Sequence, residues 1–175
     1  MKQNRKNVLF IIPSFTSGGA ENHSLYTAKA LQEIDSNLKV YFLAFGRTDE
    51  SFVSILKSNQ IEPIHYSMNG FMNFSMMDKT VNLIKLFFLL SKYKFKYIFS
   101  GTLIPNIVGG VLWRFLRTEK FFWHQWGIDT RVNSSFFEKI AIKLKPTFIA
   151  NSNVCKQNLI DLYNVNTPIK IINNP

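Results

Sequence analysis

The feature that most limits what this chain can fold into is its regular alternation of short apolar runs with longer amphipathic segments. The first apolar run, at residues 8–12, is continuous and ends at a proline, which is typical of a strand buried on both faces of a sheet. Residues 19–34 follow, and in them Leu25, Ala28 and Leu31 recur at helical spacing. Regular alternation of this kind predicts a parallel sheet with helices packed against it.

The same pattern continues to the end of the chain, with no internal repeat, low-complexity stretch or linker. We therefore predict an α/β fold with a Rossmann-like open parallel sheet, helices on both faces, and one domain over residues 1–175. The predicted strands are 8–12, 40–45, 61–66, 97–99, 120–123, 147–150 and 169–172. The predicted helices are 19–34, 49–58, 76–92, 105–117, 134–145 and 153–163. Ligands of such sheets bind at the carboxyl ends of the strands, so the loops after residues 12, 99, 123 and 150 are the ones to examine.

The charge of the chain is strongly basic and unevenly distributed. It has 21 Lys and Arg against 11 Asp and Glu, a formal net charge of +10 over 175 residues. Residues 1–87 carry +2 and residues 88–175 carry +8. A cationic second half predicts an anionic partner, namely phosphate esters or an anionic membrane surface. Nucleic acid is not predicted as a partner, because no recognised nucleic-acid-binding motif accompanies the charge.

Cysteine content and apolar run lengths limit the class of protein further. The single cysteine, Cys155, excludes an internal disulfide and a Cys-based zinc cluster, and it fits a reducing compartment. The longest apolar runs, 8–12 and 86–90, fall far below the roughly 18–20 residues of a membrane span. We therefore predict a cytoplasmic chain that is soluble or bound peripherally at the inner face of the membrane.

The loop after the first predicted strand contains two adjacent glycines, Gly18 and Gly19, at a predicted helix start. Glycines there leave backbone N–H groups bare, and a helix N-terminus favours anions. The spacing matches neither GxGxxG nor a Walker A loop. The alternative is a tight turn in which Ser17 caps the helix and Glu21 complements its dipole.

Three polar residues follow later predicted strands. His124 comes directly after residues 120–123 and could hydrogen-bond a ligand or shuttle a proton; it could equally be structural. Asn151 and Ser152 end the strand at 147–150 and open a helix, and their alternative role is helix capping. The three histidines have no metal-site spacing, so no metal is predicted.

The segment 85–97 mixes aromatic side chains with lysines at positions 85, 92, 94 and 96. One interpretation is a patch that touches anionic lipid headgroups. The other is a core helix that leads into a solvated turn.

Four ordered stretches resemble the N-terminal half of glycosyltransferase family 4. They are VLFIIPSFTSGGAENHSLYTAKAL, SGTLIPNIVGGVLWRFLR, FFWHQWGID, and FIANSNVCKQNLIDLYNV followed by IKIINNP. The family has the GT-B fold, in which two Rossmann-like domains face each other across a cleft. The resemblance implies that this chain is the acceptor-binding domain and that the C-terminal donor-binding domain is absent. The family's two glutamates eight residues apart have no counterpart here, so we expect the chain alone to be incomplete and inactive.

The resemblance also implies roles for individual residues. Gly18 and Gly19 would contact the donor diphosphate, His124 would be the catalytic residue facing the transferred sugar, and Asn151 and Ser152 would line the cleft. The partners would be a nucleotide-sugar co-substrate, with no cofactor, and a sugar or lipid-linked acceptor. The implied function is retaining glycosyl transfer in the synthesis of a surface polysaccharide or glycolipid. The alternative is a non-catalytic binding module that docks on an anionic membrane or on a partner chain, including a separate donor-binding chain.

Overall fold

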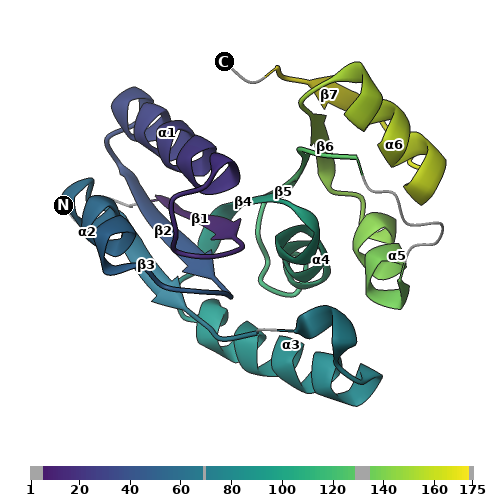
Figure 1. Cartoon of the computed structure of the whole chain (residues 1–175), viewed down its shortest axis with the longest axis horizontal. Helices are drawn as coiled ribbons and strands as arrows, with labels where there is room; N and C mark the ends of the chain where they lie inside the picture. The colour runs from purple at the N-terminus through teal and green to yellow at the C-terminus, as the bar shows by residue number, and fades with distance from the viewer. Residues whose placement is uncertain (1–5, 69, 129–134, 174–175) are drawn as a thin grey trace.

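A computed structural model describes residues 6–68, 70–128 and 135–173 of the chain. Seven strands form one sheet in the order β3-β2-β1-β4-β5-β6-β7, and all neighbouring strands pair in parallel (Figure 1). The strands are β1 (Lys6–Ile12), β2 (Leu38–Ala44), β3 (Glu62–His65), β4 (Phe95–Gly101), β5 (Lys120–Gln125), β6 (Thr147–Ala150) and β7 (Ile169–Ile171). The helices are α1 (Gly19–Ile34), α2 (Glu50–Ser58), α3 (Met76–Ser91), α4 (Leu103–Leu112), α5 (Phe136–Lys143) and α6 (Asn153–Tyr163), with a 3-10 turn η1 (Phe71–Asn73).

The central strand β1 is apolar without alternation because both of its faces are covered. Val8, Phe10 and Ile12 pack in one buried cluster, with side chains of α1 and α2. Leu9 and Ile11 pack in a second cluster, with side chains of α3, α4, α5 and α6. The helices therefore form two layers around the sheet (Figure 1), and the predicted Rossmann-like fold class is confirmed.

Helix α4 lies unusually close to the sheet and to α5 because of two consecutive glycines. A Cβ on Gly109 would lie 2.6 Å from Cε2 of Phe121 in β5. A Cβ on Gly110 would lie 2.6 Å from Cβ of Ala141 in α5. Both distances are shorter than atoms can tolerate, so only glycine allows this approach. The second half of α4 is thereby held against β5 and α5.

The predicted helix at 105–117 is wrong at both ends. Helix α4 begins at Leu103, which places Pro105 in the first turn, where its missing N–H costs no hydrogen bond. The helix ends at Leu112, and hydrogen-bonded turns follow up to Arg117, whose φ of 56° breaks the helical path. Turns replace the last predicted helical turn because the chain must reverse there to enter β5.

Within its described residues, the structure contains no helix long and apolar enough to cross a membrane. Cys155 is free and buried in α6, where it packs as a small apolar side chain.

Candidate functional site

The candidate site lies where the strand order reverses, between β1 and β4. From β1 the chain proceeds to β2 and β3 on one side, whereas β4 and the later strands extend on the other. Loops that follow β1 and β4 therefore diverge and leave a crevice at their carboxyl ends, the usual ligand position in open α/β sheets.

The loop after β1 is held by a buried carboxylate. Ser14 Oγ donates to Glu21 Oε1 at 3.1 Å and lies 2.7 Å from Thr16 Oγ1. Glu21 belongs to the first turn of α1 and is only 7% exposed. This carboxylate therefore ties the loop to the helix that follows it.

Gly18 and Gly19 open α1, with Gly18 at the N-cap position. The alternative in which Ser17 caps the helix is wrong, because no side chain among the described residues caps this helix start. Ser17 Oγ instead accepts from Asn22 Nδ2 at 3.3 Å. A Cβ on Gly19 would meet nothing within 4 Å, whereas one on Gly18 would lie 2.5 Å from Glu21 Oε2. The backbone of Gly19 is thus accessible to an incoming group.

His124 lies in β5 and is surrounded by two aromatic side chains. Its ring centroid lies 5.7 Å from that of His23 and 5.0 Å from that of Trp126, and the His23 and Trp126 rings are 4.7 Å apart. Nε2 of His124 is buried and has no hydrogen-bond partner among the described residues. Burial, with a smaller effect of His23, lowers the pKa of His124 to about 4, so its imidazole is neutral at pH 7. Burial lowers the pKa of His23 as well.

A buried polar pair fixes the backbone at His124. Ser100 Oγ donates to Asn106 Oδ1 at 2.6 Å, and Asn106 Nδ2 donates to the carbonyl of His124 at 3.1 Å. Gly101 of β4 pairs with His124 in the sheet, and the Trp126 indole lies over this glycine, where a Cβ would come within 3.0 Å of Cε2. β4, α4 and β5 together determine where the His124 ring lies.

Asn151 and Ser152 have different surroundings. Asn151 Nδ2 donates to the carbonyl of Trp126 at 3.0 Å, and its Oδ1 is buried without a hydrogen-bond partner in the described part of the chain. Ser152 caps α6, since its Oγ accepts from the backbone N–H of Cys155 at 3.2 Å. Capping is thus the observed interaction of Ser152, while Asn151 joins the group around Trp126.

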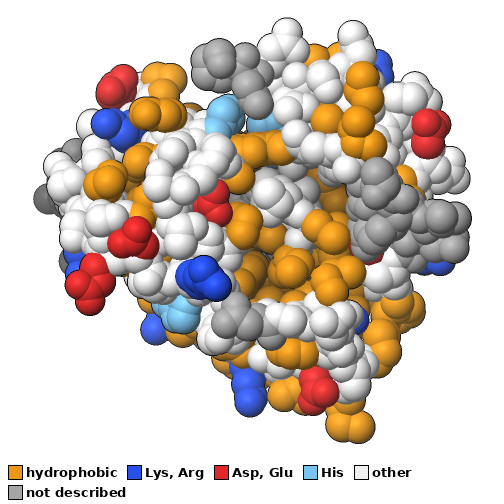
Figure 2. Space-filling view, viewed as in Figure 1, with side chains coloured by type: hydrophobic (Ala, Val, Ile, Leu, Met, Phe, Trp, Pro, Cys, Tyr) orange, Lys and Arg blue, Asp and Glu red, His pale blue; other side chains and the backbone are white. Residues whose placement is uncertain are grey.

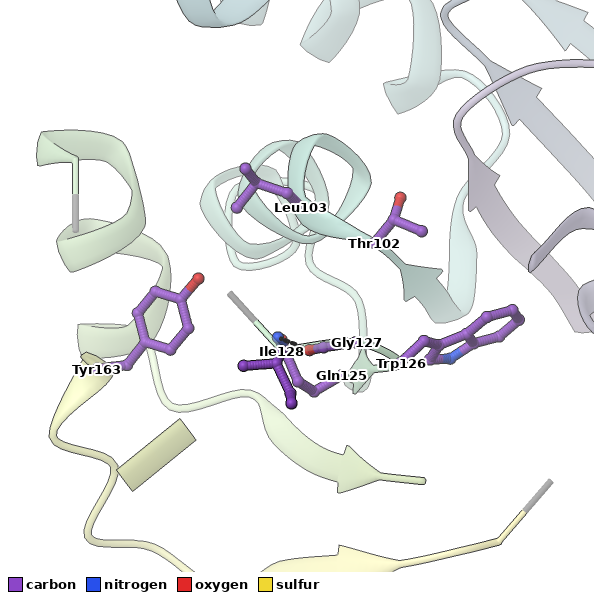
Figure 3. Close-up of a pocket in the computed structure, with 7 residues that line it drawn as sticks. All are labelled: Thr102, Leu103, Gln125, Trp126, Gly127, Ile128 and Tyr163. Carbon is purple, nitrogen blue, oxygen red and sulfur yellow. Dashed lines mark hydrogen bonds between the residues drawn. The ribbon is translucent and has the colours of Figure 1, made fainter. Parts of the chain in front are cut away.

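A pocket of about 330 Å³ opens beside this group, at the start of α4 (Figure 3). Thr102 and Leu103 lie on one side of it, Gln125 to Ile128 form its floor, and Tyr163 of α6 lies opposite. Thr102 has a φ of 72°, a backbone conformation that non-glycine residues adopt at a cost of about 1–3 kcal/mol and that recurs at functional sites. The pocket offers hydroxyl, amide and aromatic groups, a set suited to a polar ligand such as a sugar.

The structure thus brings His124 and Asn151 against one shared neighbour, Trp126, and Gly18 and Gly19 begin the helix that carries His23 to His124. Sequence reasoning missed His23 and Trp126. His23 lies one helical turn beyond the glycines and Trp126 two residues beyond His124, so their positions next to predicted site residues were the available signal. The described residues contain no group of three His, Cys, Asp or Glu side chains that could hold a metal ion.

Comparison with known proteins identifies the fold. No protein-family model and no curated protein matches the chain. A glycosyltransferase from Rickettsia africae ESF-5 superposes over 98% of this chain with a TM-score of 0.71 and 20% identity. The lipopolysaccharide outer core galactosyltransferase WaaB superposes over 97% with a TM-score of 0.66 and 13% identity. A UDP-N-acetylglucosamine 2-epimerase superposes over 95% with a TM-score of 0.60 and 13% identity.

The chain spans 43%, 46% and 48% of the lengths of these three structures, less than half of each. The likeness is one of fold, and the same fold serves both transferases and an epimerase. It agrees with the fold implied by the family 4 resemblance, a Rossmann-like half of GT-B type. Membership of family 4 itself stays a prediction.

Proposed function

We propose that this chain is the acceptor-binding half of a nucleotide-sugar-dependent, retaining glycosyltransferase that builds a surface polysaccharide or glycolipid. The observation that carries the proposal is the half-buried, neutral His124 at the carboxyl edge of the sheet, whose buried Nε2 lacks a partner among the described residues. It stands next to the helix that begins at Gly19. The solved glycosyltransferases of the same fold support this proposal.

The proposed role of the helix start is to receive the donor diphosphate. The first N–H groups of a helix have no intrahelical partner, and the helix dipole favours an anion there. Gly19 leaves open space at this point, and no side chain caps the helix. Diphosphate binding would stabilise the charge that develops on the leaving group during transfer.

The proposed role of His124 is to hydrogen-bond the sugar undergoing transfer. A pKa of about 4 makes this imidazole a poor proton acceptor at pH 7, but a good hydrogen-bonding partner in its neutral form. Reaching Nε2 requires that the rings of His23 and Trp126 move aside, because the atom is buried in their presence. The bond from the sugar's anomeric carbon to the diphosphate would then break as an acceptor hydroxyl oxygen bonds to that carbon from the same face. The hydroxyl proton would pass to the departing diphosphate oxygen, so no protein nucleophile is needed.

The proposed acceptor position is the pocket lined by Thr102, Gln125 and Tyr163. The donor nucleotide would be held by a second domain or by a separate donor-binding chain. This part of the proposal is supported by the matched structures, of which this chain covers less than half.

The test begins with the native gene product from the source cells. Its intact mass is measured, and it is incubated with radiolabelled nucleotide sugars, with and without a membrane extract as acceptor. We expect label to pass to the acceptor, and His124→Gln and Gly19→Val to reduce the transfer at least tenfold, the effect of losing one good active-site contact. His65→Gln is the control, because His65 is exposed and its Nε2 lies near the carbonyl of Gly46.

Two results would overturn the proposal. One is epimerisation of a nucleotide sugar in the absence of any acceptor, which would assign the chain to the other chemistry found on this fold. The second is normal transfer by both site variants, which would remove the assigned roles of His124 and Gly19.

A further inference from the structure

A second feature lies at the opposite end of α4 from the candidate site. An apolar groove of about 300 Å³ runs between α3 and α4, and its lining has no exposed polar surface. The lining includes Leu83, Ile84 and Phe87 of α3, Val111 of α4, Phe115 and Phe137. Since α4 is about 15 Å long, this groove is well separated from the pocket at Thr102.

Large apolar side chains around the groove face outward. Phe88 is 68% exposed and Phe115 is 63% exposed, and Met77, Val81 and Phe136 are exposed as well. Hydrophobic side chains also gather over α4 and between α4 and α3 on the face shown in Figure 2, which carries histidine side chains as well. Single exposed apolar residues are ordinary, but a contiguous group around an apolar groove marks a surface that binds something apolar.

A cationic pocket adjoins the apolar groove. Phe87 and Phe115 line both of them, and the second pocket adds Lys94 and Arg117. Both cations are exposed, and neither forms a salt bridge with another residue in the described part of the chain. Apolar and cationic groups thus stand side by side on one face.

The charge around this face is mainly positive, although Glu119 lies next to the segment 76–117 and pairs with Lys96 at 3.4 Å. Residues 76–117 contain seven Lys and Arg and one acidic residue, Asp78. Arg114 lies over the Trp113 ring at 4.0 Å, and Lys92 lies over the Tyr93 ring at 5.0 Å. A second copy of this chain would bring the same cations together and be repelled. An anionic bilayer offers the opposite charge together with an apolar interior.

We infer that this face, formed by α3, the end of α4 and the turn that follows it, docks on a membrane surface containing anionic lipid. Phe88 and Phe115 enter the acyl region, and Lys94 and Arg117 contact lipid phosphates. The docked face leaves the carboxyl edge of the sheet free, because the two lie at opposite ends of α4. The inference does not depend on the proposed transferase function.

The test is co-sedimentation of this chain with vesicles of phosphatidylcholine alone or of phosphatidylcholine mixed with phosphatidylglycerol. We expect binding to the anionic vesicles only, weakening as salt is raised. Lys94→Gln with Arg117→Gln should weaken binding about 25-fold, since each cation near an anionic surface contributes about fivefold. Phe115→Ser should weaken it about tenfold through lost apolar burial. Because Phe115 is exposed, this variant is expected to fold.

Matched controls lie elsewhere on the chain. Ile34→Ser removes an apolar side chain that is 82% exposed at the end of α1, and Lys29→Gln with Lys57→Gln removes two cations on α1 and α2. Both controls should bind like the wild type. The inference would be overturned if the controls lost as much vesicle binding as the test variants, or if the wild type bound no vesicles at all. The chain could instead dimerise in a concentration-dependent way and bind no vesicles. If Phe115→Ser abolished that dimerisation, the membrane inference would be overturned, and a second copy of the chain would be the partner of this face. No nucleotide sugar is present, so the result is independent of transfer.

Discussion

At the scale of single residues, the site depends on side chains that are buried beyond what their polarity favours. His124 is the clearest case, because its imidazole lies under the rings of His23 and Trp126 with one nitrogen unpartnered among the described residues. Such a group is held in place by the structure around it, which for His124 is the Ser100–Asn106 pair and the sheet pairing with Gly101. The unpartnered buried nitrogen costs local stability, a pattern that recurs at functional sites.

This environment predicts a pH dependence of stability. The folded pKa of His124 is about 4, below the value of about 6.5 for an unfolded histidine, so the unfolded chain binds more protons between these two values. The free energy of unfolding should therefore fall as pH drops from 6.5 toward 4, by about 2–3 kcal/mol from this residue. Urea unfolding at pH 7.5 and at pH 5 measures this loss of the free energy of unfolding.

In His124→Gln the loss between these pH values should be smaller than in the wild type, while His65→Gln should retain the wild-type loss. If His124→Gln lost as much stability between these pH values as the wild type, the pH dependence would not come from His124.

Gly101 carries a second prediction at this scale. A Cβ at this position would lie 3.0 Å from the Trp126 ring, so Gly101→Ala should displace the indole and destabilise the fold by about 1–3 kcal/mol. The displacement should appear in the near-ultraviolet circular dichroism of the protein. Gly127→Ala is the neighbouring control, since a Cβ there meets nothing within 4 Å. An unchanged spectrum for Gly101→Ala would contradict the stacking of Trp126 on this glycine.

At the scale of elements, the local sequence pattern predicts which segments are helices and strands more accurately than it predicts where each one begins and ends. The predicted helices at 19–34 and 153–163 match α1 and α6 residue for residue, because their apolar stripes and terminal residues are local signals. Helix α4 was predicted poorly because its boundaries depend on tertiary contacts. Its glycines pack against Phe121 and Ala141, which lie far along the chain, and Pro105 is tolerated in its first turn.

The packing of α4 against α5 predicts the effect of one methyl group. Alanine is favoured over glycine inside a helix by about 1 kcal/mol, but at Gly110 its Cβ would lie 2.6 Å from that of Ala141. Gly110→Ala should therefore destabilise the protein by about 1–3 kcal/mol despite the better helix propensity. Gly19→Ala, where the space is open, should leave the free energy of unfolding within about 0.5 kcal/mol of the wild type. The midpoints of urea unfolding measure both changes in stability. If Gly110→Ala were as stable as the wild type, the close packing of α4 against α5 would be refuted.

At the scale of the whole molecule, one sheet joins two buried clusters. One cluster lies under α1 and α2, and the other lies under the four later helices. Rings of Phe42, Phe10, Phe99 and Phe122 stack across four adjacent strands, with centroid distances of 5.1, 4.9 and 4.5 Å. These contacts tie four strands together on one face, and the same strands carry the cluster on the other face, so the two faces should unfold together.

A substitution on one face should therefore be detected on the other. Leu56 of α2 is fully buried, and Leu56→Ala should cost about 2–5 kcal/mol. Trp113 and Trp123 belong to the opposite cluster, and their fluorescence transition in urea should shift by the same amount as the far-ultraviolet signal. Ile34→Ala, at an exposed position, should shift neither. A tryptophan transition unmoved by Leu56→Ala would show that the faces unfold separately.

The sequence by itself determined the order and type of the elements, the parallel sheet and the edge at which a site would lie. These follow from local periodicity and from the chirality and connection rules of β–α–β units, which need no knowledge of distant contacts. The tertiary structure alone decided which side chains from distant segments meet: His23 with His124 and Trp126, and Asn151 with Trp126. It also joined α3 to the end of α4 in one apolar and cationic face. Such contacts link residues far apart in the chain, and only the packing of helices on the sheet fixes their distances.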